Sequence, residues 1–306
     1  MKNFLAMILM TAILFTGCGA ESYERSEKLM GTVLTLKAEG KNSQAAVDES
    51  FKQIGELAKT IFADVKKIEN AAEVDYVEVS PDVYKILETA QKYSELTGGA
   101  FDITVGAAIK LWGIGSENAH VPTDAELDAV KNLVGYKHLH LRGGKVYLDK
   151  RGMKITLGGV AKGYGVDIAR KIFAEKGIEN GLIDFGTSTI FAIGKKKIGI
   201  KKPDDPNNLS EVVELENSAI STSGDYEKFF VANGRRYHHI IDPKTCAPTD
   251  NGISSISVIV AGDVENCAMI ADILSTSFFV MGSSEKILKF DSQSLKQINS
   301  GQNAYR

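Results

Sequence analysis

An aspartate and a threonine four residues apart have the chemistry of a metal site. Asp272 and Thr276 lie in an apolar stretch that contains Ala268, Ile273 and Leu274, and this spacing places both side chains on one face of a helix. A carboxylate and a hydroxyl suit Mg²⁺, which keeps several waters and usually takes its remaining ligands from a phosphate. Spacing alone favours two side chains that simply face water, so a magnesium site requires a phosphate-binding element beside them.

A glycine-rich turn within residues 157–165 is a candidate for that element. The sequence runs from an apolar strand through Gly158 and Gly159 into a helix, so the unpaired amides of the helix start meet at a point where an anion can lie. Lys162 adds a positive charge there. The segment matches neither the P-loop nor the dinucleotide-binding fingerprint, and a purely structural glycine turn is the alternative.

Three further polar segments have side chains that suit a ligand. Residues 237–243 contain His238 and His239 in a strand-like run, where neighbouring side chains point to opposite faces, so the two cannot easily share one metal. Residues 219–226 are predicted as a strand that runs into a hydroxyl-rich turn able to bind a phosphate or a ribose. No base accompanies the serines of this turn, so none is assigned as a nucleophile. Residues 98–102 place an aromatic ring and a carboxylate after two glycines, which suits contact with a heteroaromatic ring.

The elements around these segments predict an α+β fold, with a largely antiparallel sheet and helices packed against it. An apolar stripe along residues 47–68 predicts one long helix. N-terminal capping signals at Ser80, Thr123 and Asp263 predict three more helices, the last of which ends near Thr276. Short apolar runs separated by turn residues are typical of antiparallel strands, and they lie at 29–38, 138–141, 146–148, 182–185, 190–193, 198–200, 212–215, 229–231, 237–241 and 253–260.

Composition and the N-terminal segment bound the cellular setting. The formal net charge of the 306 residues is −3, which leaves no surplus of positive charge for nucleic acid, so no nucleic-acid partner is expected. Residues 1–17 combine a lysine with a short apolar run before Cys18, which predicts a lipoprotein signal peptide and lipidation of Cys18. A plain secretory peptide is the alternative. One folded domain then spans residues 18–306, and Cys246 and Cys267 need not pair.

Taken together, the motifs follow one another in an order that closely resembles the ApbE family of FAD:protein FMN transferases, over about residues 29–285. Members of that family are commonly bacterial lipoproteins or exported proteins, which agrees with the interpretation of Cys18 and implies a lipid-anchored protein on the extracytoplasmic face of the membrane. The motifs that carry the resemblance are Met30-Gly31-Thr32, Thr97-Gly98-Gly99-Ala100-Phe101-Asp102, Leu111-Trp112-Gly113, Gly158-Gly159-Val160-Ala161-Lys162-Gly163-Tyr164, Ile220-Ser221-Thr222-Ser223-Gly224, His239-Ile240-Ile241-Asp242-Pro243 and Ala271-Asp272-Ile273-Leu274-Ser275-Thr276.

The resemblance implies a set of site residues. The family's Mg²⁺ ligands fall on Asp272, Thr276 and the backbone carbonyl of Gly159, and the FAD pyrophosphate would lie near Lys162. Asp272, Thr276 and Lys162 are therefore the expected catalytic residues. The expected flavin contacts are Met30, Ala100, Phe101, Asp102, Thr156, His239 and Ile241, the last two on one strand.

The resemblance also implies the reaction. A Thr or Ser hydroxyl of a flavin-accepting protein would attack the FMN phosphorus of FAD, AMP would leave, and FMN would stay on the acceptor. With water in place of that hydroxyl, the same site would hydrolyse FAD to FMN and AMP, which is the closest alternative. The alternative outside the enzymes is a non-catalytic flavin-binding lipoprotein. Residues 63–70 continue the long helix where the family has a ligand-contacting segment, so one wall on the adenine side is expected to be missing.

Overall fold

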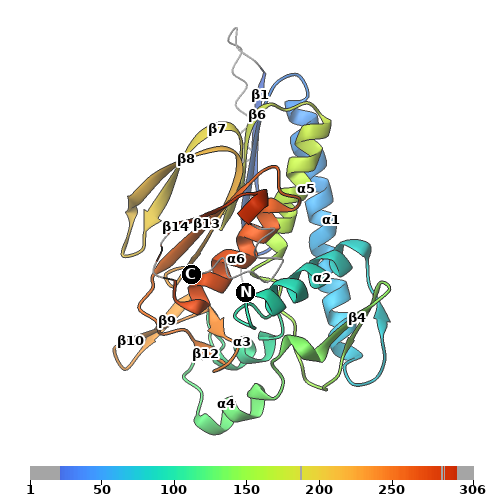
Figure 1. Cartoon of the computed structure of the whole chain (residues 1–306), viewed down its shortest axis with the longest axis vertical. Coiled ribbons are helices and arrows are strands. Elements are labelled where there is room, and N and C mark those ends of the chain that lie inside the picture. The colour runs from blue at the N-terminus through green and yellow to red at the C-terminus, as the bar shows by residue number, and fades with distance from the viewer. Residues whose placement is uncertain (1–20, 187, 284, 286, 295–306) are drawn as a thin grey trace, which may run out of the picture.

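The computed structural model of the chain describes residues 21–186, 188–283, 285 and 287–294. A large sheet with helices against one face fills the upper part of the molecule, and smaller sheets and helices lie below it (Figure 1). This arrangement confirms the predicted α+β fold. Cys18 and the predicted signal peptide lie outside the described residues. No helix in the described part of the chain is both long enough and apolar enough to cross a membrane.

The main sheet contains seven strands in the order β1-β2-β6-β7-β8-β13-β14. All neighbouring strands are antiparallel except β13 and β14, which are parallel. Alternate residues of β2 are fully buried, so one face of the sheet is apolar and must be covered. The strands are β1 (Ser22–Leu29), β2 (Thr32–Glu39), β6 (Asn180–Phe185), β7 (Thr189–Lys202), β8 (Asp205–Gly224), β13 (Ser255–Ala261) and β14 (Ile287–Phe290).

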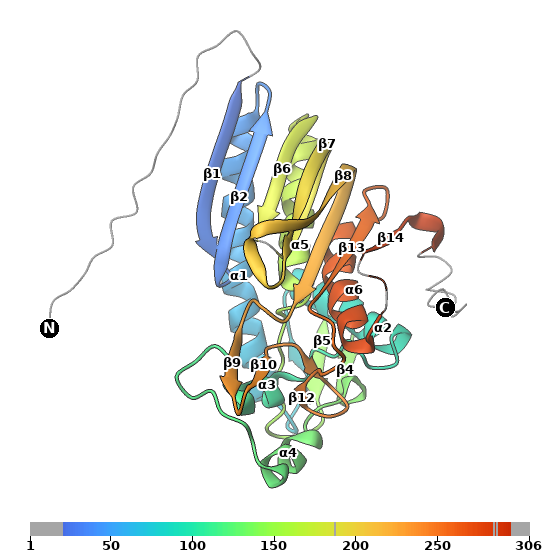
Figure 2. The ribbon, with the colours of Figure 1, turned by 90° about the vertical axis from the view of Figure 1, so that its left-hand side faces the viewer.

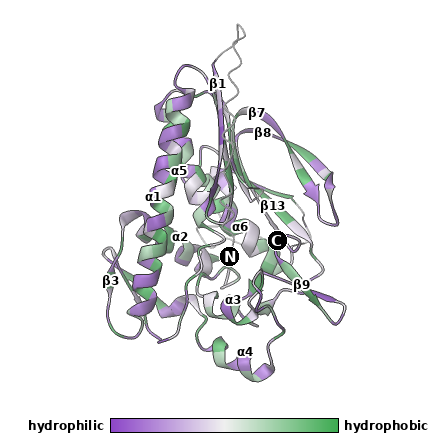
Figure 3. Cartoon of the chain, turned by 180° about the vertical axis from the view of Figure 1, so that it is seen from behind, coloured by the Kyte–Doolittle hydropathy of each residue, from purple (hydrophilic) through white to green (hydrophobic). Residues whose placement is uncertain are grey.

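Three helices cover that face: α1 (Ser43–Asn70), α5 (Ala161–Glu175) and α6 (Cys267–Met281) (Figure 2). The apolar stripe of α1 packs on the sheet as predicted, and the hydropathy colouring of α1 alternates between hydrophilic and hydrophobic (Figure 3). By contrast, twelve of the fifteen residues of α6 are buried. The polar residues of α6 therefore lie inside the protein rather than at its surface.

The remaining elements surround the lower end of the molecule (Figure 1). The predicted caps of two helices are confirmed, because Ser80 Oγ accepts from the backbone N–H of Val83 (3.3 Å) and Thr123 forms a capping box with Glu126. The elements are β3 (Val77–Glu78), α2 (Pro81–Leu96), α3 (Gly106–Trp112), α4 (Asp124–Lys131), the short 3-10 helix η1 (Tyr136–His138), β4 (Leu139–Arg142), β5 (Lys145–Leu148), β9 (Phe229–Ala232), β10 (Arg235–His238), β11 (Ile241–Asp242) and β12 (Ala247–Pro248).

Three local predictions about the strands are wrong. The runs at 190–193 and 198–200 belong to one strand, β7, which absorbs Gly194 as an irregularity in its pairing with β8. The hydroxyl-rich segment 219–224 is not a turn, because small and β-branched residues there pair with the whole of β13. The predicted strand 237–241 is divided, because β10 pairs with β9 and ends at His238, whereas β11 begins at Ile241 and pairs with β12.

The start of α6 also differs from the prediction. The helix begins at Cys267 rather than at Asp263, and Asn266 before it is left-handed (φ 55°) and makes no side-chain cap. Instead Asp167 of α5 accepts hydrogen bonds from the backbone N–H groups of Ala268 (3.2 Å) and Met269 (2.8 Å). A carboxylate from another helix therefore caps α6 and holds α5 and α6 in one alignment.

We expect Asp167→Asn to change how stability depends on pH. Burial raises the pKa of Asp167 to about 6, so near pH 4.5 the folded chain binds a proton that the unfolded chain releases. Stability from this group is therefore present at low pH and is lost as the pH rises toward 7, by about 2 kcal/mol. Urea unfolding at pH 4.5 and pH 7 should show the wild type losing that much relative to the variant; parallel profiles would contradict the assignment.

Candidate active site

Asp272 lies near the middle of α6 with only 3% of its surface exposed. One carboxylate oxygen accepts from the backbone N–H of Gly163 (3.1 Å), and the other accepts from the hydroxyl of Ser221 (3.4 Å). Burial raises the pKa of Asp272, while the nearby positive charge of Lys162 acts in the opposite direction. Asp272 is thus a buried acid whose hydrogen-bond donors, an amide and hydroxyls, are all neutral.

Thr276 and the glycine turn meet beside this carboxylate. A Cβ built on Gly159 would lie 3.0 Å from Thr276 Oγ1 and 3.2 Å from the ring of Phe101. A Cβ on Gly163 would overlap the backbone of Ala268 and Met269, so α5 and α6 touch without an intervening side chain. The structure therefore brings together Asp272, Thr276, Gly159 and Phe101 from three distant parts of the sequence.

This arrangement fits a hard cation such as Mg²⁺. In the described part of the chain, no three His, Cys, Asp or Glu side chains gather in a way that could hold a metal. A carboxylate, a hydroxyl and a backbone carbonyl are oxygen ligands that Mg²⁺ accepts, with phosphate and water completing the shell. Because the hydrogen-bond donors to the Asp272 carboxylate are neutral, a full negative charge there would gain from a cation beside it.

A network of hydroxyls lies between α6 and the sheet. Ser223 Oγ is 2.9 Å from Ser275 Oγ and 3.3 Å from Thr276 Oγ1, and Ser221 Oγ is 3.1 Å from Thr189 Oγ1. These contacts fix the rotamers of the acid and the threonine. The hydroxyl-rich string of β8 was predicted as a strand that runs into a turn; in the continuous strand, Ser221 and Ser223 share one face, which turns toward α6.

The positive charge of Lys162 acts on both Asp272 and a histidine of the site. The ammonium itself donates to the carbonyl of Gly158, and the histidine is His239. Burial, with the added charges of nearby residues, lowers the pKa of His239 to about 4, so the imidazole is neutral at pH 7. Nδ1 of His239 has no hydrogen-bond partner among the described residues, whereas Nε2 of His238 lies 2.9 Å from the carbonyl of Thr249. His239 is therefore the histidine with a free ring nitrogen.

Asp102 braces the loop that carries Phe101. Both Asp102 oxygens are already engaged, by the amide and hydroxyl of Thr104 (2.8 and 2.6 Å) and by the amide of Tyr136 (2.7 Å). Ala100 is buried. Asp102 was predicted to contact the flavin directly. Its carboxylate is instead bonded to groups of this chain, and these bonds hold the loop in place.

The other predicted flavin contacts are more widely distributed. Thr156 lies just before the glycine turn and accepts from the amide of Gly158 (3.5 Å). Met30 lies in the β1–β2 turn and packs against the main core. Ile241 is buried in a separate apolar cluster with Trp112 and Cys246. Cys246 and Cys267 are both buried and both free, which settles the question of their pairing.

Comparison with known proteins points to one family. The ApbE family profile matches residues 30–299. The FAD:protein FMN transferase of Vibrio cholerae is 32% identical, over 92% of this chain and 88% of the relative, and that of Treponema pallidum is 30% identical, over 87% and 81%. The solved ApbE protein of Thermotoga maritima superposes with a TM-score of 0.78 at 33% identity, covering 86% of this chain and 88% of that one. The Vibrio cholerae flavin transferase gives 0.74 at 30% identity, covering 87% and 88%.

We expect Asp272→Asn to abolish stabilisation of the chain by Mg²⁺. A ligand that binds only the folded state adds about 2.7 kcal/mol at a hundredfold excess over its dissociation constant, and the variant lacks the anionic ligand. Without Mg²⁺ the variant should be at least as stable as the wild type, because it buries no charge. Thermal unfolding with and without Mg²⁺ measures both effects. Asp263→Asn, at an exposed position, is the matched control, and an unchanged Mg²⁺ response in Asp272→Asn would place the metal elsewhere.

Proposed function

The chain belongs to the ApbE family, and from this membership and the geometry around Asp272 we propose that it transfers FMN from FAD to a hydroxyl group of an acceptor protein and releases AMP. The observation that carries the proposal is the convergence of Asp272, Thr276 and Gly159 at the start of α5, beside Lys162. Oxygen ligands, helix amides and an ammonium in one place suit a pyrophosphate bound together with a divalent cation.

Each side chain of the site has a role in this proposal. Asp272, Thr276 and the backbone of Gly159 hold Mg²⁺, which when bound neutralises charge on the pyrophosphate. Lys162 and the amides that follow Gly159 hold the phosphates. Phe101, an expected flavin contact, packs against Gly159 beside the proposed cation site, and with only 4% of its surface exposed its proposed part is to shape that side of the flavin site.

The remaining flavin contacts are carried over from the sequence analysis as proposals. These residues are Met30, Ala100, Asp102, Thr156, His239 and Ile241. We propose a more specific part for two of them: Asp102 braces the loop of Phe101, and His239 has a ring nitrogen without a hydrogen-bond partner among the described residues.

His239 is the side chain suited to accept the proton of the acceptor hydroxyl. In the transfer step the hydroxyl oxygen bonds to the FMN phosphorus, the bond from that phosphorus to the AMP oxygen breaks, and AMP leaves with the bonding electrons. The hydroxyl proton goes to Nδ1 of His239, which is neutral at pH 7 and has no hydrogen-bond partner among the described residues, so it can accept a proton. Asp272 is less suited to this task because its proposed part is to bind the cation.

One incubation tests the proposed function. The purified chain is mixed with FAD, Mg²⁺ and a candidate acceptor protein, and the products are separated by mass. FMN on the acceptor supports the transferase. Free FMN and AMP in its place would indicate an FAD pyrophosphatase, and intact bound FAD would indicate a flavin-binding protein without catalysis.

We expect His239→Gln to slow FMN transfer by about 10²- to 10⁴-fold, the usual contribution of a general base. FAD should still bind, because the cation and phosphate contacts lie on other residues. His238→Gln is the matched control: its ring contacts a backbone carbonyl, and we expect it to retain most of the transfer rate. Single-turnover kinetics with FAD titrations separate the two effects, and wild-type transfer by His239→Gln would remove the histidine from the mechanism.

The N-terminal sequence supports a second part of the proposal, a lipid anchor at Cys18 that holds the protein on the extracytoplasmic face of the membrane. Cys18→Ala should move the protein from the membrane fraction to the soluble exported fraction, because no other residue of the predicted lipidation motif can carry the acyl chains. Membrane fractionation followed by immunoblotting measures the shift. Equal membrane association of both versions would argue against lipidation.

A further inference from the structure

His239 lies at the junction of two small sheets rather than within a strand. β10 ends at His238 and pairs with β9, and β11 begins at Ile241 and pairs with β12. Among the described residues each of these sheets has only two strands, and a two-stranded sheet is marginally stable unless it packs against another element. The position of the His239 ring therefore depends on what holds the two sheets in place.

One side chain packs against both sheets. Trp112, the single tryptophan of the chain, is the last residue of α3 and has 3% of its surface exposed. Its ring stacks on that of Tyr237 in β10, with the ring centroids 5.3 Å apart. Its indole N–H donates to the backbone carbonyl of Cys246 (2.8 Å), just before β12, and it shares an apolar cluster with Ile241 of β11. Trp112 thus joins the strands that come before and after His239.

The helix α3 is fixed to the backbone that leads to the glycine turn. The carbonyl of Ile103, shortly before α3, accepts from the backbone N–H of Thr156 (2.8 Å). A Cβ on Gly106, the first residue of α3, would lie 2.6 Å from the carbonyl oxygen of Lys154, so the two backbones are in direct contact. Through α3, the position of His239 is therefore set relative to the glycine turn, where the phosphates are proposed to bind.

We propose that Trp112 is a positioning residue for His239 in the transfer of FMN. The proposal rests on the proposed function, in which Nδ1 of His239 accepts the proton of the acceptor hydroxyl. That nitrogen has no hydrogen-bond partner among the described residues, so no bond at Nδ1 holds the ring at its angle. Trp112 supplies this restraint through the backbone on either side of His239. The restraint matters because a general base must lie within hydrogen-bond distance of the proton that it accepts.

This role also accounts for the motif Leu111-Trp112-Gly113, whose residues are not among the expected ligand contacts. The alternative is a tryptophan that only stabilises the fold. The two roles predict different results when His239 is removed, because a positioning residue acts only through the residue that it positions.

A double-mutant cycle tests the proposal by single-turnover transfer of FMN from FAD to the acceptor. Trp112→Phe keeps an aromatic ring beside Tyr237 but removes the hydrogen bond to Cys246, and Tyr237→Leu removes the other partner of the stack. Each change should slow transfer about tenfold or more, while FAD affinity and stabilisation by Mg²⁺ stay as in the wild type. In the His239→Gln background neither change should slow transfer further. A residue that only stabilises the fold would cause its own loss in both backgrounds.

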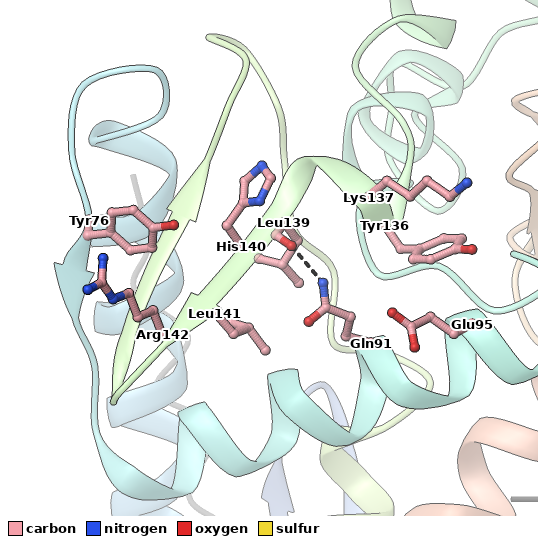
Figure 4. A pocket seen from close by; sticks show the side chains of 9 residues that line it. All are labelled: Tyr76, Gln91, Glu95, Tyr136, Lys137, Leu139, His140, Leu141 and Arg142. Carbon is pink, nitrogen blue, oxygen red and sulfur yellow. Dashed lines mark hydrogen bonds between the residues drawn. The ribbon is translucent and has the colours of Figure 1, made fainter.

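Gln91→Leu is the matched control. Gln91 Nε2 in α2 donates to the backbone carbonyl of Leu139 in β4 (2.6 Å), so this side chain also ties two elements together, but away from His239 (Figure 4). The variant should transfer FMN within about twofold of the wild type. Tyr237→Phe, which keeps the stacked ring, should recover the rate that Tyr237→Leu loses. The fluorescence of Trp112 shows whether each Tyr237 variant is folded.

Nuclear magnetic resonance spectra of ¹⁵N-labelled histidine rings test the position of His239 without turnover. With His239→Gln used for assignment, Trp112→Phe should shift or broaden the His239 signals and leave those of His140, in β4, unchanged. Wild-type transfer by Trp112→Phe, a further loss in the His239→Gln background, or unchanged His239 signals would each overturn the proposal. If the wild type transferred no FMN while the His239 signals still responded to Trp112→Phe, the proposed function would fail and the positioning of His239 by Trp112 would stand.

Discussion

The close packing of α5 on α6 is the contact on which the site depends. Gly163 has no side chain to separate the two helices, so its amide reaches the carboxylate of Asp272. Asp167, one turn further along α5, caps the start of α6. These three hydrogen bonds fix the rotation and the axial position of α6 together, and in that position Thr276 lies against Gly159.

The same packing creates an electrostatic cost that the proposed ligands would offset. Asp272 is buried among hydroxyls and one amide, and burial raises its pKa. Hydroxyls of Ser221 and Thr189 stabilise a negative charge but do not cancel it. A bound cation would therefore stabilise the negative charge of Asp272. The fold positions this carboxylate before the cation binds, as a preorganised site requires.

Local sequence signals predicted the elements well, and they failed where distant segments act on one another. The stripe along 47–68 and the caps at Ser80 and Thr123 are short-range patterns, and the structure confirms them. The cap of α6 comes from Asp167, one hundred residues earlier, so the nearby Asp263 was a false signal. The hydroxyls of β8 were noticed, but only pairing with β13 shows that they belong to a strand. Asp272, Thr276 and Gly159 were named from sequence, whereas the free nitrogen of His239 is visible only in three dimensions.

The continuous C-terminal half of α1 has a consequence for the glycine turn. Residues 63–70 remain helical where the family resemblance implies a ligand-contacting segment. Glu69, in the last turn of α1, accepts from the ammonium of Lys154 (2.7 Å) and from the backbone N–H of Ile155 (2.9 Å). Its side chain is mostly buried, so these charge-assisted bonds are shielded from water. The segment that enters the glycine turn is thereby tied to the end of α1, and the helix that lacks the expected ligand contacts instead fixes the backbone leading to Gly159.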